Sequence, residues 1–293
     1  MNCDMAEKIA NAVLYEGYML YPYRTSAVKN QQRWNFGTLY PAQFDEVRRG
    51  TERSSMHVEC LAQLGDEISI SLRARYLQFN VDAVLQGATE RAVELTLNST
   101  GPTRQDFRHP GISGGVKASV RLCIDTVADG ISKLIVDLVN EFEIEPTIDR
   151  GKVLPNSLVS AHIILCTQSG GFLSLMDPPA ALQTLTSQCK NIGCFPVLVG
   201  EEGSHDMMLC SPIILYDYPQ IAPESAGDFF DGTEMVEMLT LRVMTLTDEE
   251  KREMRGTDDR VRSLLERTEQ TAREQLTRTH GTIRSLRQID NHD

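Results

Sequence analysis

The residues best suited to chemistry are five carboxylates that follow a predicted strand in the last third of the chain. They are Asp217, Glu224, Asp228, Asp231 and Glu234. Carboxylates this close together can bind a divalent cation or exchange protons with a substrate. They can also cap a helix and hydrogen-bond within a loop, and Asp231 followed by Glu234 has the spacing of a capping box. We prefer this structural interpretation and keep a metal-dependent, hydrolase-like enzyme that uses the acidic loop 217–234 as the alternative.

A second set of possible metal ligands combines three cysteines and a histidine. The set is Cys189, Cys194, His205 and Cys210, with four residues between the members of each pair. Thiolates and an imidazole are typical zinc ligands, and this spacing is within the usual range. However, the set lacks a Cys-x-x-Cys knuckle, and Cys210 lies at the start of an apolar strand, where cysteine is most often a small core residue. We therefore prefer core packing to a zinc site and expect no cofactor.

A cysteine nucleophile would need a histidine base beside its thiol. The possible nucleophiles are Cys60, Cys123 and Cys166, and the possible bases are His57, His109 and His162. Cys123 and Cys166 fall within apolar strands, where burial keeps a thiol protonated and inert. The Gly-x-Ser-x-Gly pattern occurs at residues 111–115, but it lies in the predicted loop between strand-like segments and not between a strand and a helix, so a serine nucleophile of that type is not indicated either. These patterns favour a protein that is not an enzyme.

An aromatic and basic cluster near the N-terminus is a candidate for a partner-binding surface. It comprises Tyr21, Tyr23, Arg24, Lys29, Arg33 and Trp34. Arginine and aromatic side chains are enriched at protein interfaces, and Arg24 or Arg33 can pair with a carboxylate or phosphate. The simpler interpretation is a structural turn whose arginines pair with acids of the same chain.

A long helix with a narrow apolar face is predicted from residue 258 to about residue 278. Its apolar stripe includes Leu265 and Leu276, and threonines interrupt the seam. A helix with so little apolar surface is typical of an arm that packs against a partner or a second copy of the chain, rather than of a core helix. We therefore predict that Leu265 and Leu276 contact a partner and that the protein forms a homo-oligomer.

The elements that position these residues are predicted to be mainly antiparallel strands. Alternating or continuous apolar runs predict strands at 56–64, 68–76, 91–97, 117–127, 131–142, 157–167, 172–176, 195–199 and 208–216. Asp129-Gly130 predicts one hairpin and Ser169-Gly170-Gly171 another. A helix is predicted at 180–190, and the Gly, Pro, Ser and Thr residues of 98–115 predict a long loop.

Strands and helices gather in separate parts of the chain instead of alternating, which favours an α+β fold over a parallel α/β fold. We predict a largely antiparallel β body, two-layered or sandwich-like, in residues 1–230. A helical C-terminal region follows in residues 231–293.

Charge and composition exclude several classes of protein. The formal net charge is −12, and residues 248–293 contain ten basic and eleven acidic residues, so the first 247 residues carry −11. An acidic body argues against binding nucleic acid or an anionic membrane surface. No apolar run is long enough for a membrane span, and the N-terminus lacks the apolar core of a signal peptide. We expect a cytoplasmic protein whose seven cysteines are reduced.

Three blocks of the sequence resemble a known family. They are VLYEGYMLYPYRTSAVKNQQRWNFG, LSLMDPP and SPIILYDYPQIAPESAGDFFDGTEMVEMLTLRVMTLTDEEKREMRGTD. Together they are similar to a bacterial family associated with nickel–iron hydrogenase gene clusters, notably those of the high-affinity, actinobacterial type. The resemblance implies an accessory role in hydrogenase assembly, maturation or docking, with a hydrogenase subunit or a maturation protein as partner. It implies no catalytic residues. A self-assembling homo-oligomeric scaffold is a further alternative.

Overall fold

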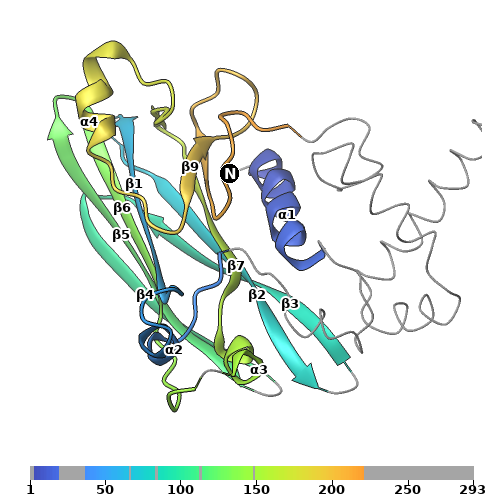
Figure 1. The fold of residues 1–293 in the computed structure, drawn as a ribbon. Coiled ribbons are helices and arrows are strands. Elements are labelled where there is room, and N and C mark those ends of the chain that lie inside the picture. The colour runs from blue at the N-terminus through green and yellow to red at the C-terminus, as the bar shows by residue number, and fades with distance from the viewer. Residues whose placement is uncertain are drawn as a thin grey trace, which may run out of the picture.

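The structure is a computed structural model that describes residues 3–19, 37–65, 67–82, 85–111, 114–147 and 149–220. These residues fold mainly into two antiparallel β-sheets that pack face to face (Figure 1). The predicted antiparallel, two-layered β body is therefore confirmed. The predicted helical region 231–293 lies outside the described residues and stays a prediction.

The first sheet, which we call the β1 sheet, has the strand order β4-β5-β6-β1-β8. Its strands are β1 (Ser55–Leu64), β4 (Gly101–Pro110), β5 (Gly115–Ala128), β6 (Ile131–Asn140) and β8 (Gly170–Phe172). Strands β5 and β6 form the hairpin predicted at Asp129-Gly130. Gly130 has a φ of +67°, which the tight turn requires and which glycine adopts without strain.

The second sheet, the β7 sheet, has the strand order β3-β2-β7-β10-β9. Its strands are β2 (Ile70–Asp82), β3 (Leu85–Leu97), β7 (Val159–Thr167), β9 (Phe195–Leu198) and β10 (Met207–Ser211). Strands β2 and β3 pair along their whole length, so both are longer than the runs predicted at 68–76 and 91–97.

The main core lies between the sheets because alternate residues of a strand point to opposite faces. From β1, Met56, Val58, Cys60 and Ala62 join this core, whereas His57 and Glu59 lie on the outer face of the β1 sheet. Every residue of β7 is buried, because a helix covers the outer face of its sheet.

That helix is α1 (Asp4–Met19), which lies against the β7 sheet on the side away from the β1 sheet (Figure 1). Its buried residues Ala6, Ile9 and Ala10 pack on apolar side chains of β7, β9 and β10. The helix is tied to the sheet by a disulfide between Cys3 and Cys166. The expectation of seven reduced cysteines is therefore wrong for this pair, and the other five are free thiols. The sequence could not indicate the pairing, because it depends on the packing of α1 onto a strand 163 residues away.

The short helices connect strands. They are α2 (Ala42–Val47), α3 (Arg150–Val153), the 3₁₀ turns η2 (Leu154–Asn156) and η3 (Ala180–Leu182), and α4 (Gln183–Ser187). The helix predicted at 180–190 is thus present but shorter. In the described part of the chain, no helix is both long and apolar enough to cross a membrane.

Three other predictions are wrong. The loop predicted at 98–115 is largely strand β4, which pairs with β5 from Gly101 to Pro110. The second predicted hairpin does not form, because β7 and β8 belong to different sheets and the turn between them carries the chain across the sandwich. The strand predicted at 208–216 ends at Ser211, since the next residue, Pro212, has no N–H to continue the ladder.

Candidate functional site

Most of the residues predicted to bind partners or metal lie outside the described residues. For the partner surfaces these are Tyr21, Tyr23, Arg24, Lys29, Arg33, Trp34, Leu265 and Leu276, and for the acidic loop they are Glu224, Asp228, Asp231 and Glu234. Their assignments stay predictions.

Asp217, the first residue of the acidic loop, is placed and has a structural role. Its Oδ1 accepts a hydrogen bond from the Leu198 N–H at 2.8 Å, and its Oδ2 accepts one from the Ser174 hydroxyl at 2.5 Å. The Ser174 oxygen in turn accepts from the backbone N–H groups of Met176 and Asp177. Asp217 therefore connects a turn to strand β9, which agrees with the structural interpretation of this residue.

Each of the four possible zinc ligands either lies within hydrogen-bonding distance of a backbone carbonyl or is buried in the core. The Cys189 thiol donates to the Leu185 carbonyl at 3.7 Å, and the Cys194 thiol donates to the His57 carbonyl at 3.4 Å. The His205 Nδ1 lies 3.0 Å from the Phe172 carbonyl oxygen, and Cys210 is buried in the main core. Across the described ranges, no group of three or more His, Cys, Asp or Glu side chains is arranged to hold a metal ion.

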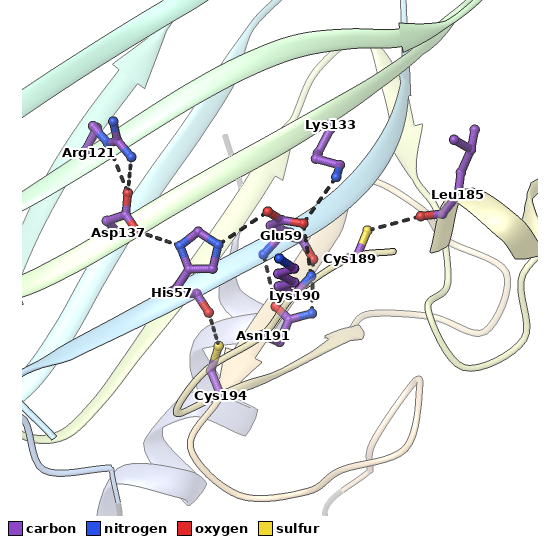
Figure 2. A network of polar contacts seen from close by, with 10 residues as sticks. All are labelled: His57, Glu59, Arg121, Lys133, Asp137, Leu185, Cys189, Lys190, Asn191 and Cys194. Carbon is purple, nitrogen blue, oxygen red and sulfur yellow. Dashed lines mark hydrogen bonds and ion pairs between the residues drawn. The ribbon is translucent and has the colours of Figure 1, made fainter. Parts of the chain in front are cut away.

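The most developed polar site lies on the outer face of the β1 sheet (Figure 2). We call it the His57 cluster, and its members are His57, Glu59, Arg121, Lys133 and Asp137. They come from the adjacent strands β1, β5 and β6. The strand register places Asp137 directly opposite both His57 and Arg121, so these three side chains project from one face.

The side chains form a continuous chain of contacts. His57 Nδ1 lies 2.6 Å from an oxygen of Asp137, and Nε2 lies 3.4 Å from an oxygen of Glu59. Arg121 donates to the second oxygen of Asp137 from Nε at 2.9 Å and Nη2 at 2.5 Å. Lys133 donates to the second oxygen of Glu59 at 3.2 Å. Both carboxylates are therefore paired with cations and with the imidazole.

The cluster also holds a segment that we call the strap, residues 189–194, along the part of β1 that lies beyond its pairing with β8. The backbone N–H of Ile192 donates to the His57 carbonyl at 2.8 Å, and the Ile192 carbonyl accepts from the His57 N–H at 3.0 Å. The Asn191 side chain replaces a strand partner for Glu59, since its oxygen accepts from the Glu59 N–H at 3.0 Å and its nitrogen donates to the Glu59 carbonyl at 3.2 Å. The Lys190 N–H donates to the Glu59 carboxylate at 3.0 Å.

These contacts set the charge states of the two acids. Burial raises the pKa of Glu59, but hydrogen bonds from the Lys190 N–H, Lys133 and His57 outweigh it, so the pKa lies below its usual value. Burial likewise raises the pKa of Asp137, but hydrogen bonds from His57 and Arg121 lower it by more, so the pKa of Asp137 also lies below its usual value. Both side chains are carboxylates at neutral pH.

The geometry fits a structural role, holding the strap against β1, better than a catalytic role. An imidazole oriented by an aspartate is half of a nucleophile-activating triad, but its other nitrogen faces Glu59. No thiol in the described ranges is hydrogen-bonded to the imidazole ring, since the Cys194 thiol bonds to the His57 backbone instead. Burial raises the pKa of Cys194 to about 12, so this thiol is protonated.

From the sequence, His57 stands out only as a possible base for a cysteine, and its partners in the cluster are not apparent. The available signal was the alternation of β1 and β6, which places polar residues at His57 and Glu59 and at Lys133 and Asp137. Recognising it requires the register of the β1–β6 pair, which the sequence does not specify.

No protein-family model and no curated protein matches the chain.

Proposed function

We propose that this chain is a non-catalytic accessory protein that binds a protein of nickel–iron hydrogenase assembly through a surface held in place by the His57 cluster. The class of partner, a hydrogenase subunit or a maturation protein, comes from the resemblance of three sequence blocks. The proposed binding surface is formed by the strap and by Phe195, the residue that follows it.

The observation that carries the proposal is the exposure of apolar side chains on a fixed backbone. Ile192 is 47% exposed although its backbone is bonded on both sides to His57, and Phe195, at the start of β9, is 43% exposed. Exposed apolar groups on an ordered backbone favour binding, because little conformational entropy remains to be lost when a partner covers them. The polar groups beneath the strap are engaged with one another, which supports a positioning role rather than chemistry.

The test is recovery of hydrogenase proteins with the tagged full-length chain from cells that express the hydrogenase. The double variant Ile192→Arg/Phe195→Arg should recover at least about tenfold less partner, since central apolar contacts carry most of an interface's energy. The matched control is Val127→Arg, which alters an exposed apolar residue of strand β5, outside the strap, and should leave recovery unchanged.

Two results contradict the proposal. One is equal recovery by the double variant and the control. The other is no recovery by the unmodified chain, together with normal hydrogenase activity in a strain that lacks the gene. Metal analysis of the purified chain separates the enzyme alternative, because stoichiometric zinc, iron or manganese that is lost on Asp228→Ala or Asp231→Ala would favour that alternative.

A further inference from the structure

Four buried polar atoms of strands β2 and β7 have no hydrogen-bond partner among the described residues. One is Nε of Arg73, whose guanidinium is already paired with Glu7 and Glu94, and the other three form the candidate site. These three are Nη1 of Arg75, Oγ of Ser160 and Nε2 of His162. The three residues are 4%, 1% and 0% exposed. Buried polar groups in folded proteins are nearly always hydrogen-bonded, because removing them from water without a partner is costly. Arg75 lies opposite His162, and Ser160 is two residues from His162 along β7, so their unpartnered atoms indicate that a polar group binds near these residues.

The backbone brings these residues together. Arg75 of β2 and His162 of β7 are directly opposite one another, so their side chains share the face that α1 covers. Between Arg75 and Leu77 the register shifts at a β-bulge, and Ser160 lies within it with a φ of +51°. Bulges redirect side chains, and non-glycine residues with left-handed φ are found preferentially at functional sites.

The hydrogen-bonding roles of the three atoms follow from their neighbours. His162 Nδ1 lies 2.9 Å from the Ser160 carbonyl oxygen, which can only accept, so Nδ1 carries the proton and Nε2 presents a lone pair. Arg75 is held through Nη2 by Glu90 and by the Asn11 side chain of α1, so the N–H groups of Nη1 remain available. Burial and the nearby Arg75 charge lower the pKa of His162 to about 4, so its imidazole is neutral at pH 7. The site therefore offers donors from Arg75 and Ser160 and an acceptor on His162.

We propose that Arg75, Ser160 and His162 bind the carboxyl group of a small monocarboxylic acid. One oxygen of the carboxyl accepts from Arg75 Nη1 and from the Ser160 hydroxyl. The other oxygen takes up one proton from solvent on binding and, as an O–H, donates to His162 Nε2, so the acid binds in its neutral form. A phosphate dianion fits less well, because Glu90 already neutralises Arg75. The site lies on the opposite sheet from the His57 cluster and is independent of the proposed function.

The test uses the full-length chain with acetate as the probe and chloride at equal ionic strength as the reference. Acetate should produce a saturable shift of the His162 Nε2 signal in ¹⁵N NMR, and chloride should not. Ser160→Ala should weaken acetate binding by about tenfold, as expected for one hydrogen bond to a carboxyl oxygen. Because the Ser160 hydroxyl has no described partner, this variant should unfold at the same temperature as the unmodified chain or higher.

The matched control is Ser119→Ala on the other sheet. Ser119 is also buried, but its hydroxyl donates to Glu141 at 2.8 Å, so this variant should be less stable and should bind acetate normally. Three outcomes overturn the proposal. They are no saturable shift with acetate, a crystal structure in acetate that shows only an ordered water between the three atoms, and a loss of stability in Ser160→Ala equal to that in Ser119→Ala.

Discussion

Among single residues, Glu59 is the one whose carboxylate connects the His57 cluster to the strap. Its carboxylate contacts His57, Lys133 and the Lys190 N–H, and its backbone is bonded to Asn191. The side chain is 13% exposed, so these contacts are only weakly screened by solvent. The ionised carboxylate of Glu59 therefore stabilises the fold. Removing its charge weakens contacts to the strap as well as contacts within the sheet.

Glu59→Gln tests this role. The variant keeps the size of the side chain but loses the charge, so the free energy of unfolding at pH 7 should fall by about 1–2 kcal/mol. The folded-state pKa of Glu59 is lowered, so its stabilisation is present above the unfolded pKa of about 4.3 and is lost as the pH falls through the folded value. Urea unfolding at pH 7 and at about pH 3 should therefore show a smaller difference between variant and unmodified chain at the lower pH.

The control for this prediction is Glu94→Gln. Glu94 pairs with Arg73 at 3.0 Å but is 66% exposed, and exposed pairs contribute only about 0–1 kcal/mol. A loss in Glu59→Gln no larger than in this control, or one that is equally large at about pH 3 and pH 7, would show that the cluster does not stabilise the fold through charge.

The residue type and its neighbours in the sequence predicted the role of a side chain where that role depends on burial. Cys60 and Cys210 are core residues, as their apolar strands indicated, and Asp217 serves the backbone. The His57 cluster and the Arg75–His162 pair could not be predicted, because each depends on which residues of two distant strands lie opposite one another. Period-two alternation gives the face of a residue but not its cross-strand partner.

At the scale of elements, the strands with strong alternation were predicted and the connections were not. The prediction of a hairpin at Gly130 was correct because Asp-Gly has a local conformational preference that the rest of the fold does not override. Strand β4 was missed because its glycine and prolines resemble a loop. Its two prolines, Pro102 and Pro110, are tolerated because β4 is an edge strand with one unpaired side. The turn at Gly170 was misassigned because a turn signal does not say whether the chain returns to the same sheet.

Gly170 shows what that turn requires. Its φ is +88°, and a Cβ at this position would lie 2.0 Å from the Gln63 carbonyl oxygen of β1. Gly170→Ala therefore adds a backbone clash to conformational strain, and β8 must move away from β1. Gly203 is the matched control, because its φ is +85° but a Cβ added there would meet nothing within 4 Å.

Gly203→Ala should cost about 1–2 kcal/mol of strain alone. Gly170→Ala should cost a further ~1–3 kcal/mol for the clash, measured as the difference in urea unfolding free energies of the two variants. Equal losses would mean that β8 is not packed against β1 as described.

At the scale of the whole molecule, charge is distributed unevenly along the chain. The first 247 residues carry −11, and residues 248–293 are close to neutral. Like-charged bodies repel one another, so association of two copies is favoured through a near-neutral segment. The predicted apolar stripe with Leu265 and Leu276 falls in this segment, which is why we expect it to mediate self-association.

Deletion of residues 256–293 should therefore convert the oligomer to a monomer, as judged by light scattering at several protein concentrations. Leu265→Asp/Leu276→Asp should have the same effect within the full chain, because charges in an apolar seam are not compensated when two helices pack. Gln270→Asp/Thr277→Asp adds the same charge away from the predicted stripe and should leave the mass unchanged. A full-length chain that is already monomeric, or an oligomer that survives both the deletion and the leucine changes, would assign self-association to another surface or exclude it.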